Sequence, residues 1–157
     1  MATLGELMHD TFVTVAPEDT VGEAAQKMVE AGRGAAAVSD FGRLIGILTD
    51  RDVLRSVAAR THSSEERVRS WMTPDPITAS RDMPSEEAAE IMLANGFRHL
   101  PIVEGERAIG IISIRAVSAV NNTGVFFEIT GSVGAAALLF FGAIFFFHHD
   151  AGFHILV

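Results

Sequence analysis

The chain has 157 residues, a formal net charge of −8 and no cysteine. Its length fits one ordinary domain or two half-size units that share a core, and the lack of cysteine excludes a disulfide framework and thiol chemistry. The acidic balance argues against a general nucleic-acid-binding protein, which would carry a basic stripe. Residues 1–10 contain no basic segment typical of a signal peptide, so we expect a cytoplasmic protein.

The predicted elements begin with a short β-type run and a helix with clear end signals. Thr20 is a good N-cap, and Glu23, three residues later, completes a capping box. Apolar residues then recur at helical spacing up to Gly32, where a C-terminal glycine belongs. Two apolar runs joined by a turn suit a hairpin, and a closing helix follows. The expected order is strand, helix, strand, strand and helix, at residues 12–15, 21–31, 35–38, 44–48 and about 51–60.

The same order of elements returns with an offset of 64 residues. The second set is expected at residues 76–79, about 85–95, 100–103, 108–112 and about 114–120. Matched positions include Met8 with Met72, Gly32 with Gly96 and Arg51 with Arg115. A period this long indicates one supersecondary unit built twice. Two such copies usually pack around a pseudo-symmetric cleft, which favours ligand binding over catalysis.

Short motifs within the two copies point to a family. Residues 46–52 read Gly-Ile-Leu-Thr-Asp-Arg-Asp, residues 98–103 read Arg-His-Leu-Pro-Ile-Val, and Gly-Ile-Ile-Ser follows at 110–113. With these motifs, residues 4–120 resemble a tandem pair of cystathionine-β-synthase (CBS) domains, often called a Bateman module. The resemblance implies an α/β (α+β) fold of two β-α-β-β-α units packed pseudo-symmetrically. The expected parts are a first CBS domain at 4–62, a second at 66–121 and an apolar, helical C-terminal tail at 122–157.

In that family the domain pair binds adenine nucleotides or related adenosyl ligands in the cleft between its copies and acts as a sensor. The resemblance therefore implies a regulatory, energy-sensing module and not an enzyme. AMP, ADP or ATP is the expected ligand, ahead of S-adenosylmethionine and NAD. A homodimer is also expected, acting on a regulated protein that no residue here identifies.

The first candidate site lies where the 44–48 run meets the closing helix. Thr49 and Asp52 are three residues apart at the helix entry, so both side chains can face one point beyond it. A hydroxyl and a carboxylate can hold the two ribose hydroxyls of a nucleotide, and Arg51 can meet phosphate. The alternative is that Thr49 and Asp52 are only a cap and a first-turn acid.

The resemblance completes this site from the opposite copy. It implies contacts from Thr78 on the first strand of copy two, and from Arg98 and His99 before the Leu-Pro pair. His99 has an alternative interpretation as a hydrogen-bonded structural histidine.

The second candidate site departs from the first. Ser113 keeps the hydroxyl and Arg115 keeps the phosphate partner, with Thr14 and Arg33 on the opposing side, but Ala116 occupies the carboxylate position. Losing a charge-assisted hydrogen bond to ribose removes roughly 1.5–3 kcal/mol, or about tenfold or more in affinity. We therefore expect one competent site and one weaker or empty site in each chain.

The tail contains 19 consecutive residues without a charge, at 129–147. As a helix this segment would span about 28 Å, close to the thickness of the bilayer hydrocarbon. We expect a C-terminal membrane anchor, and two alternatives stay open: burial against the domain pair or a sister chain, and a chimeric extension. His148, His149, Asp150 and His154 resemble metal ligands, but an interfacial polar flank is favoured for them.

Two other functions compete with a nucleotide sensor. A scaffold or interaction protein would keep the fold without the ligand and be tethered by its tail. An enzyme is disfavoured because the sequence offers no nucleophile–base pair, metal triad or paired acids at a suitable spacing, and the repeat takes up the whole region before the tail.

Overall fold

The computed structural model describes residues 2–8, 11–60, 62 and 64–120 of the chain. The chain divides into two units, residues 1–119 and 120–157, and both hydrophobic cores of the described residues lie in the first. No helix among the described residues is long and apolar enough to cross a membrane. The predicted anchor at 129–147 and the histidines at 148–154 lie outside the described residues.

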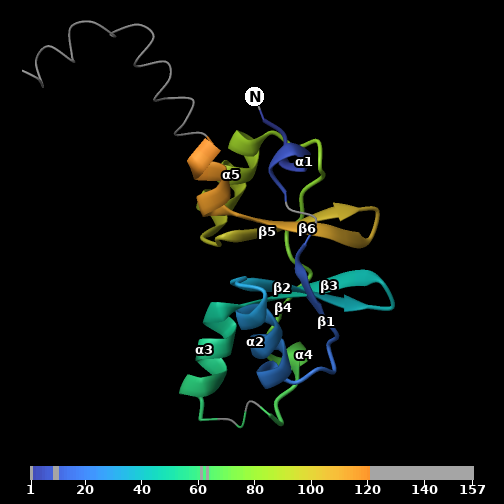
Figure 1. Ribbon diagram of the computed structural model, residues 1–157, viewed down its shortest axis with the longest axis vertical. Coiled ribbons are helices and arrows are strands. Elements are labelled where there is room, and N and C mark those ends of the chain that lie inside the picture. Colours follow the sequence, from blue (N-terminus) through green and yellow to red (C-terminus); the bar gives the residue numbers. More distant parts are fainter. Residues whose placement is uncertain (1, 9–10, 61, 63, 121–157) are drawn as a thin grey trace, which may run out of the picture. The chain divides into compact units, whose positions relative to one another are not determined.

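The first repeat forms a sheet covered by helices (Figure 1). The elements are β1 (Val13–Val15), α2 (Val21–Glu30), β2 (Ala35–Asp40), β3 (Arg43–Thr49), α3 (Asp50–Ala58) and, from the segment between the repeats, β4 (Thr73–Pro74). Strand β1 runs parallel to β2, β2 pairs antiparallel with β3, and β3 pairs antiparallel with the short strand β4. The predicted order of strand, helix, strand, strand and helix is confirmed in this repeat.

Local sequence explains where these elements begin and end. The Thr20 hydroxyl accepts a hydrogen bond from the Glu23 amide at 3.1 Å, and the Glu23 carboxylate accepts from the Thr20 amide at 2.8 Å, which is the predicted capping box. In β1, Val13 and Val15 are buried and the intervening Thr14 is exposed, as the period of a half-buried strand requires. The Val side chains anchor β1 to the core of the repeat.

The second repeat has the helix and the hairpin of the first. It contains α5 (Ser85–Asn95), β5 (His99–Glu104), β6 (Arg107–Ser113) and a helical segment at 114–120. Gly96 ends α5 in the left-handed conformation, with φ 70°, where a side chain would be strained.

The predicted strand at 76–79 is wrong except at its last residue. Ala79 alone forms a parallel bridge, to Ile102. Pro76 has no amide to donate to a ladder, and Ile77 is 46% exposed where the matched Val13 is buried. Only Ala79 therefore has both the burial and the backbone partners of a strand residue, since it exchanges hydrogen bonds with Pro101 and Val103.

Each repeat is completed by a short helix that precedes the other repeat in the sequence. Helix α1 (Leu4–Leu7) comes before β1, yet Leu4 is fully buried in the second core, beside Met92 and Leu100. Helix α4 (Val68–Trp71) comes before the second repeat, and Val68 is fully buried in the first core. The sequence analysis missed both helices, because four residues are too short for a periodic pattern.

Matched backbone hydrogen bonds hold the two exchanged helices. The Val68 amide donates to Asp19 at 2.9 Å, and the Leu4 amide donates to Met83 at 3.0 Å, 64 residues away in each position. In each repeat a methionine then covers a strand glycine. A Cβ at Gly46 would lie 2.5 Å from the Met72 sulfur, and one at Gly110 would lie 2.8 Å from the Met8 methyl. The exchange is thus a repeated feature of the fold.

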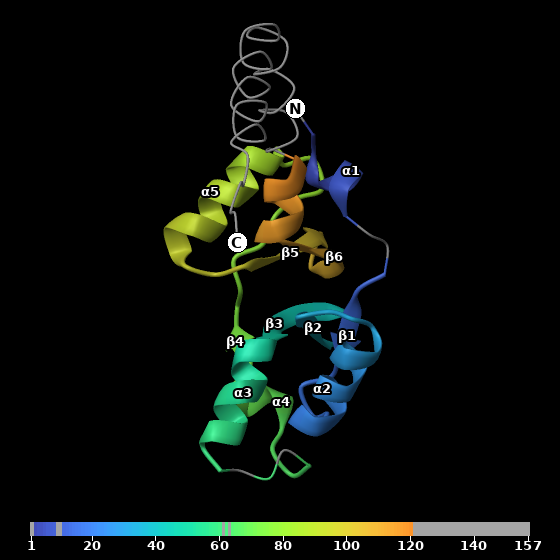
Figure 2. The ribbon, with the colours of Figure 1, turned by 60° about the vertical axis from the view of Figure 1, so that its left-hand side comes forward.

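Two hairpins face each other between the repeats, with helices on the outer sides (Figure 2). The Leu44 amide on β3 donates to the Glu106 carbonyl at 2.8 Å, and Arg43 forms an ion pair with Glu106 at 3.4 Å. The turns of the hairpins therefore lie side by side. The pockets form at the other ends of the hairpins, where the strands meet the helices.

We expect Leu4→Ala to lower the free energy of unfolding by about 2–5 kcal/mol, as for other buried leucines, although Leu4 lies near the start of the chain. Urea unfolding followed by circular dichroism measures this. Phe41→Ala is the control, because Phe41 is fully exposed in the turn between β2 and β3 and its truncation should change stability by about 0.5 kcal/mol or less. Equal effects of the two variants would contradict the role of α1 in the second core.

Candidate functional site

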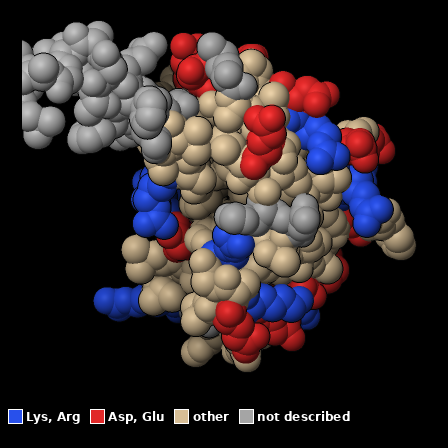
Figure 3. All heavy atoms as spheres, turned by 45° about the horizontal axis from the view of Figure 1, so that its top comes forward, with Lys and Arg blue, Asp and Glu red and all other residues tan. Residues whose placement is uncertain are grey.

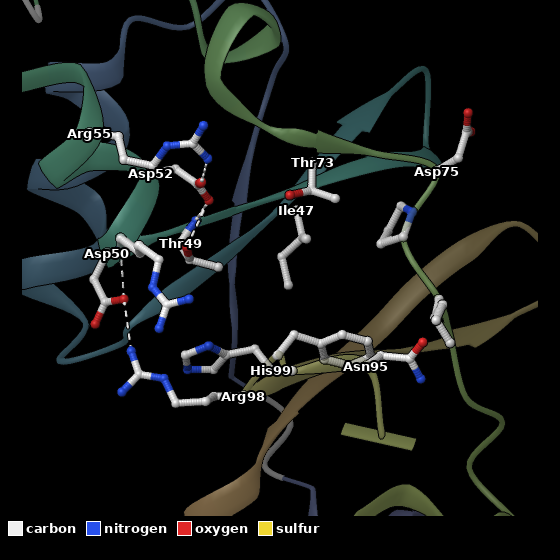
Figure 4. Close-up of a pocket in the computed structure, with 15 residues that line it drawn as sticks. Ile47, Thr49, Asp50, Asp52, Arg55, Thr73, Asp75, Asn95, Arg98 and His99 are labelled. Atoms are coloured by element: carbon white, nitrogen blue, oxygen red, sulfur yellow. Dashed lines mark hydrogen bonds and ion pairs between the residues drawn. The ribbon is translucent and has the colours of Figure 1, made fainter. Parts of the chain in front are cut away.

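The first pocket lies where β3 enters α3 and is closed by the second repeat (Figure 4). Its volume is about 440 Å³, within the range of about 300–1,000 Å³ usual for small-molecule sites. One wall comes from residues 47–55 of the first repeat, and the other comes from residues 73–77 and 95–99. The pocket therefore exists only when both repeats are packed together.

Asp52 has two neighbours at the inner end of this pocket. One carboxylate oxygen, Oδ2, accepts hydrogen bonds from the Thr49 amide at 2.9 Å and the Thr49 hydroxyl at 2.7 Å. The other oxygen, Oδ1, lies 3.6 Å from the Arg55 guanidinium. Thr49 and Asp52 thus form the start of α3, as one interpretation of the sequence holds. Among the described residues, the partner of Oδ1 is this exposed arginine, so Oδ1 remains able to accept a hydrogen bond from a ligand hydroxyl.

Asp50, Arg98 and His99 line one side of the pocket. Arg98 lies 3.5 Å from the Asp50 carboxylate, and both side chains are more than half exposed. An exposed ion pair of this kind contributes about 0–1 kcal/mol, so an incoming phosphate can replace Asp50 as the partner of Arg98. A Cβ at Gly34 would lie 3.3 Å from His99 Nε2 and 3.4 Å from an Asp50 oxygen, so a side chain at this position would crowd the His99 imidazole.

The surroundings of His99 favour its neutral form. Burial lowers the pKa of its imidazole, the Asp50 carboxylate opposes that shift, and the Arg98 and Arg115 guanidinium groups add to it. A neutral imidazole has one donor and one acceptor nitrogen, so it can orient a polar ligand without contributing charge.

The opposite part of the first pocket is apolar. Ile47, Ile77 and Phe97 contribute this surface, together with Pro76. The pocket therefore combines an apolar surface for a flat base, a carboxylate for hydroxyl groups, and the Arg51, Arg55 and Arg98 guanidinium groups for an anion.

A second pocket occupies the matched position and has a volume of about 320 Å³. It is formed where β6 enters the helical segment 114–120, opposite residues 32–35. Asp50, Arg98 and His99 line this pocket as well, so the two pockets share a wall. Arg33 stands where Phe97 stands in the first pocket, and its guanidinium lies 3.5 Å from the Thr11 hydroxyl.

Most of the predicted site residues line the two pockets. Thr49, Arg51, Asp52, Arg98 and His99 line the first, and Arg33, Ser113 and Arg115 line the second. Thr78 and Thr14 are exposed and outside the described linings. Sequence reasoning missed Asp50, Arg55, Asp75 and Phe97. Arg55 follows Arg51 by one helical turn, a spacing that does place two side chains on one face of a helix.

The family model for the CBS domain matches residues 4–59 and 68–120. The chain therefore belongs to the CBS domain family as a tandem pair, and its mixed α/β fold is the CBS-domain fold. A CBS-domain-containing protein of Agrobacterium tumefaciens has a TM-score of 0.70 at 32% identity, covering 76% of this chain and 99% of that one.

Two further relatives concern ligands and enzymes. A CBS domain protein of Pyrobaculum aerophilum, solved in complex with AMP, has a TM-score of 0.68 at 26% identity and covers 73% of this chain and 89% of that one. The inosine-5'-monophosphate dehydrogenase of Methanocaldococcus jannaschii is 40% identical over 114 residues, 71% of this chain. The chain spans only 22% of that enzyme's length.

We expect the protein to lose stability as the pH falls below the ordinary histidine pKa of about 6.5. The pKa of His99 is lowered on folding, so below that pH the unfolded chain binds a proton more readily than the folded one. The stability is fully present above the unfolded pKa and is lost as the pH falls through the folded one. Urea unfolding from about pH 8 to about pH 5 should show a smaller decrease in His99→Gln. Parallel curves for the two proteins would contradict this role.

Proposed function

We propose that the chain is a regulatory module that binds an adenine nucleotide, AMP, ADP or ATP, in the first pocket. The observation that carries the proposal is the convergence of Asp52, Phe97 and three arginines on one cavity formed by both repeats. Asp52 would accept from a ribose hydroxyl through Oδ1, and Phe97 with Ile77 would contact the base. The arginines would hold the phosphates, with Arg98 exchanging Asp50 for the ligand. The complex of the Pyrobaculum aerophilum relative with AMP supports this ligand class.

The role proposed here is sensing and not catalysis. The relatives are CBS-domain proteins, and in the dehydrogenase the matched part is a small fraction of the chain. The described face in Figure 3 mixes acidic and basic side chains around a broad uncharged area, which does not favour a nucleic-acid partner. The boundaries at 4–62, 66–121 and 122–157, and a ligand contact for Thr78, stay predictions.

The second pocket is proposed to bind an adenosyl ligand weakly or not at all. Its Ser113 and Arg115 match Thr49 and Arg51, but Ala116 offers no acceptor for ribose. Thr14 and Arg33 stay the predicted contacts on the opposing side.

We expect AMP, ADP or ATP to raise the melting temperature of the wild-type protein and to give a much smaller rise in Asp52→Ala. Removing Asp52 also removes a helix cap, so a control with the same structural loss is needed. Glu23→Ala removes the matched carboxylate of the α2 capping box, outside both pockets, and should lower the melting temperature but keep the ligand-induced rise. Thermal-shift measurements with these nucleotides, S-adenosylmethionine and NAD test the ligand class.

Two results would contradict the proposal. A wild-type protein indifferent to every adenosyl ligand would favour the ligand-free scaffold. Calorimetric titration that gave two equally tight nucleotide sites in each chain would contradict the asymmetry between the pockets.

A homodimer is the proposed assembly. Val29 on α2 and Leu93 on α5 occupy matched positions and are 80% and 72% exposed, and Leu54 on α3 is 67% exposed. Apolar side chains on the outer helices are a suitable surface for a second copy.

The tail at 129–147 is proposed as a membrane anchor on its sequence alone, since these residues carry no charge. We expect the full chain to require detergent and a chain ending at Val120 to need none, because the anchor would be removed. Sedimentation with and without detergent measures this, and the shortened chain should sediment as a dimer. Identical behaviour of both chains without detergent would contradict the anchor, and a monomeric shortened chain would contradict the dimer.

A further inference from the structure

The two pockets differ in charge more than their matched folds suggest. Asp50 and Arg98 line both pockets and balance each other in both. In the first pocket, the remaining arginines, Arg51 and Arg55, are balanced by Asp52 and Asp75. The remaining arginines of the second pocket, Arg33 and Arg115, have no carboxylate among the described lining residues. The described lining of the second pocket therefore carries an excess of positive charge, although the chain as a whole is acidic.

The groups around this excess charge suit a small anion. Within the described part of the chain, neither Arg33 nor Arg115 forms an ion pair. The Thr11 and Ser113 hydroxyls lie in the same lining and can donate hydrogen bonds. Arg98 and Arg115 line the same pocket as His99, and the charges of both guanidinium groups lower the pKa of its imidazole.

The same pocket lacks what a nucleoside needs. Ala116 replaces the carboxylate that would accept from ribose, and Arg33 replaces the aromatic surface of Phe97 that would contact a base. Its volume is also smaller, at about 320 Å³ against about 440 Å³. Both differences from the first pocket make the lining less suited to a nucleoside and more suited to an anion.

We infer that the second pocket binds a phosphate or diphosphate group without a nucleoside, held by Arg33, Arg98 and Arg115. Guanidinium groups bind phosphate oxygens through paired hydrogen bonds, and several around one cavity select for more than one negative charge. The anion would compete with Asp50 for Arg98. This inference does not depend on the adenosyl proposal, because it concerns a different pocket and a ligand without a base or a ribose.

Calorimetric titration of the full chain with inorganic pyrophosphate tests the inference. Wild-type protein should bind one pyrophosphate, and Arg115→Gln should weaken binding about tenfold or more through loss of a charge-assisted contact. Arg107→Gln is the matched control: it removes an arginine from the same β6 hairpin but outside both pockets, and it should leave pyrophosphate binding unchanged. The absence of pyrophosphate binding, or equal losses in the two variants, would overturn the inference.

Ala116→Asp gives a second, independent variant at an exposed position. The new carboxylate would balance one arginine, so pyrophosphate should bind about tenfold more weakly. Unchanged pyrophosphate affinity in this variant would contradict binding of pyrophosphate in the second pocket. Circular dichroism and the melting temperature establish that each variant is folded.

Adenosine and ATP separate the possible sources of the phosphate. Adenosine has no phosphate and should bind together with pyrophosphate, whereas displacement of pyrophosphate by ATP would identify a nucleotide phosphate as the natural source. Displacement by adenosine would place both ligands in the first pocket and overturn the inference. Pyrophosphate binding that persists in Asp52→Ala, with adenosine binding lost, supports both proposals, and pyrophosphate binding without any adenosine binding leaves only this one.

Discussion

The exchange of the leading helices is the constraint on which the rest of the molecule depends. Leu4 fills the core of the second repeat and Val68 fills that of the first, so neither core is complete without a segment from the other half of the sequence. Each exchanged segment also brings a methionine against a strand glycine, Met8 at Gly110 and Met72 at Gly46. A side chain at either glycine would meet that methionine, so small residues at these positions let the crossing segments lie directly on the sheets.

The exchange explains why the pockets belong to both repeats. The chain that leaves α4 passes through β4 beside β3 and continues along the first pocket at residues 73–77 before it reaches α5. The pocket wall is thus the connection itself, and its position is set by the burial of Val68 on one side and the Ala79 bridge on the other. A ligand there would contact the connecting segment and both repeats together, which is the mechanical requirement for a module that reports binding through its packing.

Sequence predicted the elements whose signals are local. Thr20 with Glu23 and the glycine after α5 set helix ends that the structure confirms, because caps are decided within a few residues. The exchange of the leading helices could not be predicted from the sequence. The repeat shows that Met8 matches Met72, but it does not show which core either residue enters. The predicted strand at 76–79 was wrong for a related reason. Its apolar residues suggested a strand, but the burial of Ile77 depends on distant parts of the chain, and the structure leaves this side chain exposed.

The candidate site likewise contains residues that local sequence could predict and residues that it could not. The residues at the entry to α3 share one helical turn, so Thr49, Arg51 and Asp52 could be grouped from their spacing alone. The opposing residues, Arg98 and His99, came from the family resemblance. Asp50 and Phe97 were missed because their relevance depends on which side chains face them across the cleft, and the sequence contains no local sign of that.

The two pockets differ in charge although the two repeats share one fold. The reason is that α3 and the matched helical segment 114–120 begin with different capping groups. In the first repeat, the Asp52 carboxylate caps α3 by accepting from the amide and the hydroxyl of Thr49, so this residue serves the helix as well as the pocket. In the second repeat, the Ser113 hydroxyl accepts from the Ala116 amide at 3.3 Å, so a cap is present without any acid. A side-chain cap contributes about 0.5–2 kcal/mol whichever group provides it. The helix start therefore tolerates alanine at 116, and the second pocket is free to differ in charge while its backbone stays matched to the first.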